Sequence, residues 1–455
     1  MTNLLTPNNN RHITEGPITK TLVTLAFPLI VGMFMEIALS MTHYFWVGRL
    51  GPTAQDAVTT SMVVIWTVVA ATSIVSVGIT ALISRNVGAR NFDRAAYFVK
   101  QGLALAVIIG LVVGATGVLF SEKLLVFMNA GENTIAMGLP YLKIFFGSTV
   151  LLFLLETSYA AFRSSGNTKT PAFIGITVVI INLVLDPLFI FGIGPFPELG
   201  VMGAGVATAI AYLAGVAASL TLIHKGKLGY HPPKILPLNL SIKDMMAIVR
   251  IGMPMSGHQL VFMIVYWFLI IIVHKFGEAA GAAMGIGNRM ESFSYMICHG
   301  ISLAASAMVG QNLGAGKPER AAQSVWHAVG LGIIVTTVVS IVFLIFSRQI
   351  ASVFSDSPAV IDFAKDYLII LALSQMTMAV EIILEGSFAG AGDTVPPMLV
   401  MIQGHLIRIP LAYFLCFNLG WGINGVWWTL TITTTIKAII LALWFRRGKW
   451  KEKVI

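Results

Sequence analysis

Arg-Asn-Val-Gly-Ala-Arg-Asn-Phe-Asp-Arg-Ala-Ala at residues 85–96 returns as Gln-Asn-Leu-Gly-Ala-Gly-Lys-Pro-Glu-Arg-Ala-Ala at residues 311–322. We call the shift that takes position 85 to position 311 the repeat offset. Two further matches have the same offset: the Gly-Asn-Thr of residues 166–168 with the Gly-Asp-Thr of residues 392–394, and Pro28 with Pro254. Three matches at one offset indicate an internal duplication, with one structural unit in each half of the chain. The glycines permit tight turns, so we expect both copies to connect helices.

The chain around these turns has the composition of a membrane protein. Of its 455 residues, 56% are hydrophobic and 11% are charged, whereas soluble domains carry about 25% charged residues. Apolar segments of about 20 residues mark transmembrane helices. The sequence predicts an all-α polytopic membrane protein, with twelve transmembrane helices arranged as two pseudo-symmetric six-helix lobes. The expected helices are 22–47, 58–84, 96–120, 139–162, 171–192, 201–223, 245–273, 283–309, 323–347, 363–388, 398–418 and 425–446.

The distribution of lysine and arginine predicts the orientation in the membrane. Twenty of the 29 Lys and Arg residues lie in the termini and the even-numbered connections, and six lie in the odd-numbered ones. Positive charge is retained on the cytoplasmic side, so both termini and the long middle loop are expected there. Both repeats then start on the same side, and a binding site is expected between the lobes. The predicted parts are a cytoplasmic segment 1–21, an N-lobe 22–223, a linker 224–244, a C-lobe 245–446 and a cytoplasmic tail 447–455.

Several other classes of function are disfavoured by composition. The net charge of +9 is explained by basic cytoplasmic loops, so we expect no nucleic-acid partner. Cys298 and Cys416 both lie in apolar segments, which argues against a disulfide framework or a zinc site. No cleavable signal peptide and no cofactor are expected. The short loops favour a bacterial or archaeal inner membrane.

One predicted transmembrane segment carries an acid within an apolar run. Asp186 lies in the stretch Ile-Asn-Leu-Val-Leu-Asp-Pro-Leu-Phe-Ile-Phe-Gly at residues 181–192, and a carboxylate at that depth needs a partner, a proton or a cation. Asn182 is one helical turn earlier on the same face, and Pro187 removes a backbone donor. These features favour a site for a small cation, with Asn182 and Asp186 as ligands if that cation is Na⁺. The alternative is an acid satisfied by a basic side chain on a neighbouring helix.

The first predicted helix carries a second polar face. Glu36, Ser40 and His43 are spaced so that all three share one face, and Glu36 could join Asp186 within the N-lobe. A histidine can exchange protons near neutral pH, which favours H⁺ as the coupling ion. The alternative is that Glu36 and His43 satisfy each other or another buried neighbour.

The tenth predicted helix carries two carboxylates, Glu381 and Glu385, one turn apart. They would repel when both are ionised, so they favour a bound cation, either a cationic substrate or a second coupling ion. The alternative is an ion pair with Arg289 or Arg408. The inward-facing residues near these acids that are predicted to line a substrate cavity include Tyr159, Met263, Tyr266 and Met378.

The paired motifs resemble those of the multidrug and toxic compound extrusion (MATE) family. The resemblance is carried by Val87–Ala89 and Val309–Ala315, by the paired Gly-Asn/Asp-Thr turns, and by twelve helices arranged as six plus six. It implies two lobes in a V, and export of drugs or toxic organic compounds driven by Na⁺ or H⁺.

The resemblance also bears on single residues. Asn182 and Asp186 match an Asn-x-x-x-Asp-Pro pattern that one branch of the family uses to bind its coupling ion. That branch has an acid in the first helix where this sequence has His43. The other branch places acids in helices seven and ten, of which only Glu381 and Glu385 in helix ten are present here.

The expected function is therefore ion-coupled antiport of small organic, often cationic, compounds across the lipid bilayer. The expected coupling ion is H⁺ or Na⁺, and the protein is expected to act as a monomer. A flippase for lipids or lipid-linked saccharides is the alternative, kept open by Arg163, Arg289 and Arg408. A membrane enzyme is disfavoured because no Gly-x-Ser-x-Gly or His-Glu-x-x-His motif occurs in the sequence.

Overall fold

The computed structural model describes residues 11–231 and 239–455, apart from the side chains of residues 11, 12 and 36. Parts of the predicted N-terminal segment and of the predicted linker thus lie outside the described residues. Within the described ranges the secondary structure is entirely helical. Ten helices are long and apolar enough to cross a membrane, and the number rises to twelve when each of two bent helix pairs is taken as one span. The predicted twelve spans agree with this upper number.

The first half of the chain forms the helices that we call the N-lobe, α2 to α8. A short helix, α1 (Arg11–Glu15), precedes them. The N-lobe helices are α2 (Ile18–Gly48), α3 (Pro52–Gly88), α4 (Phe92–Phe127), α5 (Glu132–Gly147), α6 (Thr149–Ser164), α7 (Lys169–Phe191) and α8 (Val201–His224). These helices extend several residues beyond most of the predicted apolar spans, because polar turns continue the helix outside the apolar stretch.

The second half forms the C-lobe, α9 to α16, followed by a short 3₁₀ turn at Lys449–Glu452. Its elements are α9 (Ile242–His274), α10 (Glu278–Gly314), α11 (Pro318–Phe354), α12 (Pro358–Ala372), α13 (Gln375–Ala391), α14 (Val395–Leu406), α15 (Arg408–Tyr413), a π-helical turn at Phe414–Asn418, and α16 (Asn424–Arg446). The duplication is visible in these bounds, because the repeat offset takes both ends of α3 onto the two ends of α10.

Two of the predicted spans are broken helices. The pair α5 and α6 bends by 49° and the pair α12 and α13 bends by 57°. The breaks lie at Ser148 and at Ser374, which are equivalent positions of the repeat. In each case the serine hydroxyl donates to a backbone carbonyl three residues earlier, Phe145 and Leu371. Such side-chain bonds compete with the helical backbone ladder, which accounts for a break within an apolar run that hydropathy does not reveal.

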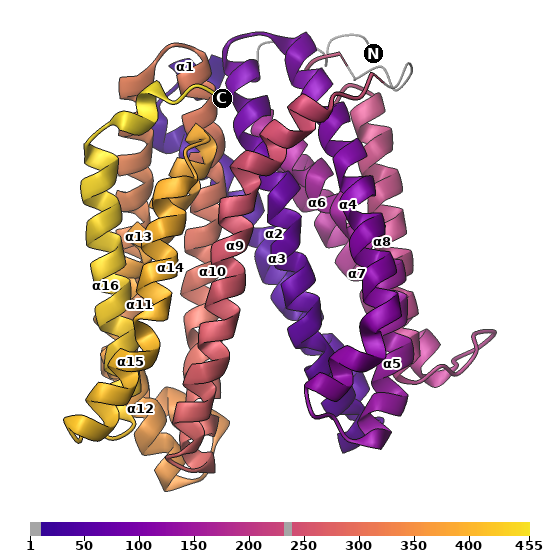
Figure 1. Cartoon of the computed structure of the whole chain (residues 1–455), viewed down its shortest axis with the longest axis vertical. Coiled ribbons are helices and arrows are strands. Elements are labelled where there is room, and N and C mark those ends of the chain that lie inside the picture. The colour runs from indigo at the N-terminus through magenta and orange to yellow at the C-terminus, as the bar shows by residue number, and fades with distance from the viewer. Residues whose placement is uncertain (1–10, 232–238) are drawn as a thin grey trace.

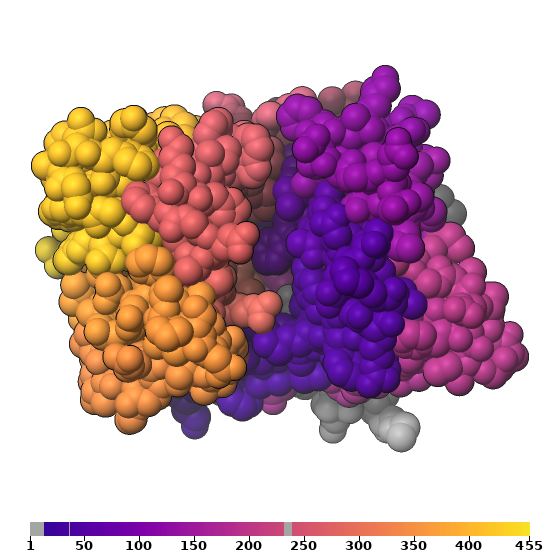
Figure 2. All heavy atoms as spheres, turned by 90° about the horizontal axis from the view of Figure 1, so that it is seen from below, coloured from indigo at the N-terminus to yellow at the C-terminus, as the bar shows by residue number. Residues whose placement is uncertain are grey.

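The two lobes meet at one end of the molecule and diverge at the other (Figure 1). The end at which they meet carries α1 and the C-terminal residues. Viewed from the opposite end, a hollow separates α9 and α10 from the first helices of the N-lobe (Figure 2). The helices α2 and α9 connect the halves, since α2 packs on α7 and also on α10, and α9 packs on α3 and also on α14.

The repeated motif itself forms a close contact between the halves. Arg90 and Gly316, at equivalent positions, both have positive φ (59° and 71°), which confirms the expected turns. Beside these turns, the ends of α3 and α10 pack on each other reciprocally. A Cβ on Gly88 would lie 1.9 Å from the carbonyl oxygen of Gln311, and a Cβ on Gly314 would lie 1.9 Å from the carbonyl oxygen of Arg85. The motif therefore seals the closed end as well as turning the chain.

Candidate functional site

Three helices of the N-lobe bring polar side chains around Asp186. His43 on α2 and Asp186 on α7 are separated by 143 residues in the chain, and their Nδ1 and Oδ2 atoms are 3.2 Å apart. Asp186 is fully buried and His43 is 5% exposed. A buried carboxylate is stable only when its charge is compensated, and the imidazole provides that compensation directly. The structure thus joins the two predicted residues in one site.

Asn182 completes the N-lobe site. With its amide nitrogen toward Asp186 it donates to both carboxylate oxygens, at 3.0 and 3.1 Å, and its oxygen accepts from the backbone nitrogen and the hydroxyl of Thr208 on α8. This orientation satisfies both ends of the amide, whereas the reverse would place two acceptors face to face. Asn182 therefore shares a site with Asp186, as the shared helical face predicted.

Two further residues of this site were not identified from the sequence. Thr208 lies in an apolar, Gly- and Ala-rich helix, where a threonine hydroxyl gives little signal. Tyr141 on α5 is buried, and its ring centroid lies 6.2 Å from that of His43. No local pattern relates either residue to Asp186, because each lies on a different helix. The side chain of Glu36, which was predicted to join this site, lies outside the described residues, so its role remains a prediction.

The C-lobe holds a second buried charge cluster. The Nζ atom of Lys437 on α16 lies 2.7 Å from Glu381 Oε1 on α13, with side chains 2% and 12% exposed. The sequence alternatives for the ion-pair partner of Glu381 were Arg289 and Arg408. The structure places Lys437 in direct contact with Glu381, and Arg408 interacts electrostatically with the same acid. Arg289 is exposed, and Arg408 donates to the hydroxyls of Thr433 and Thr434 at 2.9 and 3.1 Å.

The other acids of the C-lobe also face basic groups. Glu385 lies 2.9 Å from His258 Nε2 on α9, and His299 interacts electrostatically with the same carboxylate. Glu291 on α10 interacts electrostatically with Arg408 and Lys437. The two predicted carboxylates of α13 thus share one cluster but have different partners, a lysine and a histidine.

The predicted cavity residues are distributed among different environments. Tyr159 packs within the N-lobe core, and Met378 packs with Cys298 and Ile382 in the C-lobe. The sulfur of Met263 on α9 accepts from the hydroxyl of Thr67 on α3 at 3.6 Å, so it lies where the lobes face each other. The hydroxyl of Tyr266 contacts the amide nitrogen of Asn288. Their roles as cavity residues remain predictions.

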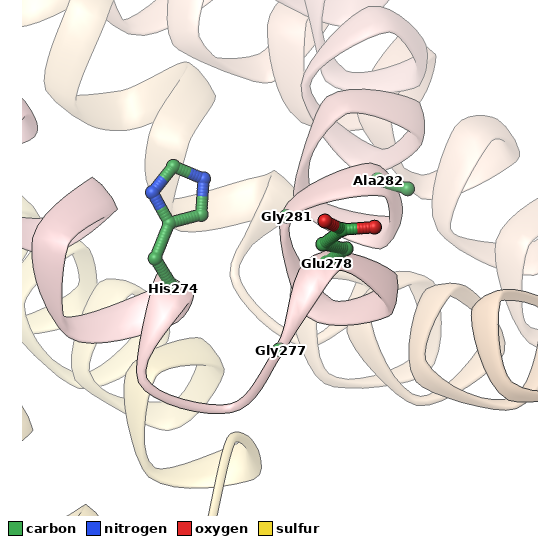
Figure 3. A pocket seen from close by; sticks show the side chains of 5 residues that line it. All are labelled: His274, Gly277, Glu278, Gly281 and Ala282. Atoms are coloured by element: carbon green, nitrogen blue, oxygen red, sulfur yellow. The ribbon is translucent and has the colours of Figure 1, made fainter.

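A further pocket lies at the open end of the C-lobe, where α9 ends and α10 begins (Figure 3). It is lined by His274, Gly277, Glu278, Gly281 and Ala282. None of the residues of the two buried charge clusters lines it. Among the described residues, no group of three or more His, Cys, Asp and Glu side chains is arranged to hold a metal ion.

Comparison with known proteins gives the family. The MatE family model matches residues 28–188 and, a second time, residues 254–414. The second matched segment is the first one shifted by the offset of the repeated motifs, at its start and at its end.

Two relatives match nearly the full chain. The "FAD transporter" of Shewanella oneidensis is 27% identical over 419 residues, covering 92% of this chain and 91% of that protein. The "Probable multidrug resistance protein NorM" of Thermotoga maritima is 26% identical over 444 residues, covering 96% and 94%.

Solved structures share the fold. One described as the outward-facing conformation of a multidrug resistance MATE family transporter of the MOP superfamily has a TM-score of 0.90 at 22% identity, covering 97% of this chain and 98% of that chain. A MOP superfamily transporter from Pyrococcus furiosus, described as having a binding pocket of reverse polarity, has a TM-score of 0.91 at 22% identity, covering 98% and 99%. The family model, matched over both halves of an integral membrane protein, shows that this chain belongs to the MatE family, the multidrug and toxic compound extrusion transporters.

Proposed function

We propose that this protein is a proton-coupled antiporter that exports small organic compounds by alternating access, with Asp186 and His43 as the coupling site. The observation that carries the proposal is the fully buried Asp186 carboxylate held by His43 and Asn182. An ionisable residue buried within a transmembrane bundle marks an ion or proton pathway in many membrane proteins.

The donor set around Asp186 favours a proton over Na⁺. Hard cations are bound through oxygen atoms. Here the carboxylate faces two nitrogen groups, the imidazole of His43 and the amide of Asn182. A proton can be taken up by the pair without rearrangement, whereas Na⁺ would require both nitrogen groups to turn away.

The helix α2 connects this site to the contact between the lobes. Its second half carries His43 to Asp186 on α7, and its first half packs on α10, where a Cβ on Gly300 would lie 2.6 Å from Ile30 Cγ1. Protonation of Asp186 removes the charge that attracts His43, which weakens the contact between α2 and α7. Coupling follows if the protonated and deprotonated pairs favour different arrangements of the lobes, because a ligand shifts an equilibrium only through differential affinity.

The distribution of positive charge supports an outward-open state. The closed end of the molecule carries α1 and the C-terminal residues, the parts whose lysines and arginines predict a cytoplasmic location. The hollow between the lobes then opens away from the cytoplasm. In this state protons enter from outside, and cargo is released to the same side.

The test uses the full chain in liposomes, with ethidium as cargo and either a pH gradient or a Na⁺ gradient imposed. We expect the pH gradient alone to drive ethidium movement, and Asp186→Asn to reduce it to the background of empty liposomes. The control is Glu132→Gln, which removes an exposed carboxylate of the same lobe. Movement driven only by Na⁺, or undiminished movement by the Asp186 variant, would overturn the proposal.

The same assay addresses the cargo. The relatives include a protein named as a FAD transporter as well as proteins named for multidrug resistance. FAD is therefore included as a second, anionic cargo. Transport of FAD but not of ethidium would retain the coupling site and change the cargo class. Transport of neither would favour the lipid or lipid-linked saccharide flippase.

A further inference from the structure

The C-lobe cluster contains a lysine in an environment that normally excludes one. Lys437 is 1% exposed and lies within a transmembrane helix, and its ammonium is 2.7 Å from Glu381 Oε1. Lysines in such segments usually extend toward the membrane surface. This side chain instead points into the lobe, and the opposite charge of Glu381 compensates it.

The neighbouring helix is shaped to accommodate that side chain. Gly404 on α14 lies against it, and a Cβ at that position would be 2.3 Å from Lys437 Cδ and 2.4 Å from Cγ. A larger residue at position 404 would therefore displace the aliphatic part of the lysine. The glycine and the ion pair are independent observations, and both indicate a site built to hold Lys437 in this position.

Acidic and basic side chains gather around Lys437. The acids are Glu291, Glu381 and Glu385, and the bases are Lys437 and Arg408. His258, which contacts Glu385, is a third basic group. The other titratable groups that face the cluster are His299, His405, Tyr266, Tyr295 and Tyr367.

The N-lobe has no fixed cation at the equivalent positions. By the repeat offset, Lys437 corresponds to Ala211 and Arg408 corresponds to Asn182. The acid Asp186 corresponds to Ala412. One repeat thus pairs its acid with a titratable histidine and an amide, whereas the other supplies two cations of its own.

We propose that the Lys437 ammonium is a built-in cation of the C-lobe, which neutralises Glu381 in place of a mobile ion and confines the coupling ion to the N-lobe. A mobile Na⁺ or proton that neutralised Glu381 would have to replace the ammonium. The lysine cannot leave, so this half of the protein remains neutralised through the whole cycle. The inference rests on the proposed antiport only in assigning the coupling ion to the N-lobe.

The first test measures thermal unfolding of the purified full chain and does not depend on transport. Lys437→Met removes the ammonium and keeps the aliphatic chain, so Glu381 must recruit a mobile cation. We expect the melting temperature of this variant to rise by about 2–5 °C in NaCl relative to choline chloride of equal ionic strength, or on acidification from about pH 8 to 5. The wild type should lack this additional response.

A double variant identifies the group responsible. Lys437→Met combined with Glu381→Gln removes both charges, so the gained response to Na⁺ or acid should disappear. Persistence of that response in the double variant would overturn the proposal, as would its absence in Lys437→Met.

A second measurement keeps the proposal testable if Lys437→Met does not fold. In an otherwise wild-type protein, Asp186→Asn should remove the Na⁺-dependent or acid-dependent shift in melting temperature that belongs to the coupling ion. A shift that survives in Asp186→Asn and vanishes when Glu381 and Lys437 are also neutralised would show that the C-lobe binds the ion. Failure of proton-driven transport alone would overturn the proposed antiport but not the role of Lys437.

Discussion

The N-lobe and the C-lobe descend from one repeat, yet their buried charges are arranged in opposite ways. In each lobe, one side chain contacts a threonine of the following transmembrane helix. Asn182 on α7 contacts Thr208 on α8, and Arg408 on α15 contacts Thr434 on α16. The repeat offset takes the first pair onto the second. The same backbone geometry therefore holds a neutral amide beside an acid in one lobe and a permanent cation in the other. Shared packing does not imply shared chemistry.

The first prediction concerns the contact between the ends of α3 and α10, where the two copies of the motif pack on each other in the same way. Replacing Gly88 or Gly314 by valine puts side-chain atoms into a contact in which even a Cβ would lie 1.9 Å from a backbone oxygen. We expect both variants to lose pH-driven ethidium transport to background, because the lobes cannot close at this end. Gly330→Ala is the control, since a Cβ there meets no atom within 4 Å. Loss in only one of the two glycine variants would show that the contact is not reciprocal.

The next effect separates the lobes by stability. Lys437→Met removes the direct ion-pair partner of the buried Glu381 and should lower the free energy of unfolding by about 3–5 kcal/mol. Adding Glu381→Gln should restore most of that loss, because neither charge then remains unpaired. Lys451→Met is the control, since its partner Glu319 is 79% exposed and such surface pairs contribute about 1 kcal/mol or less. Equal losses in the single and double variants would contradict this account of the C-lobe.

The two histidine–carboxylate pairs should differ in function. His43→Gln can still donate to Asp186 but cannot take up a proton, so we expect transport to fall by about tenfold or more and to lose its dependence on pH. His258→Gln, beside Glu385, should preserve that pH profile. The measurement is the initial rate of ethidium transport across the pH range. A flattened profile in the His258 variant would place coupling in both lobes.

The smallest effect is expected from the matched threonines. Thr208→Val removes a hydroxyl that contacts Asn182, and Thr434→Val removes one that contacts Arg408. Each change should lower the free energy of unfolding by about 1 kcal/mol. Thr208→Val should also lower transport several-fold, because Asn182 then loses a group that orients it toward Asp186. Thr434→Val should change the melting temperature with little change in transport rate. Similar transport losses in both would remove the functional distinction between the lobes.

Much of the site could be anticipated because it depends on local patterns. Asp186 is conspicuous in an apolar run, and Asn182 follows from the helical period. The partner of Glu381 could not be found in this way. Lys437, Arg408 and Arg289 all lie within apolar segments, and nothing in the spacing along the chain distinguishes which of them faces α13.

Hydropathy, helical period and repeat offset are properties of the chain read in order, and they predict the membrane class, the twelve spans, the duplication and the acid at the centre of the N-lobe. Which groups neutralise the buried charges depends on the packing of the helices. This packing brought His43 to Asp186 across 143 residues and Lys437 to Glu381 across 56. The reason is physical: the stability of a buried charge depends on the side chains that packing places within a few ångströms, and those come from helices distant in the chain.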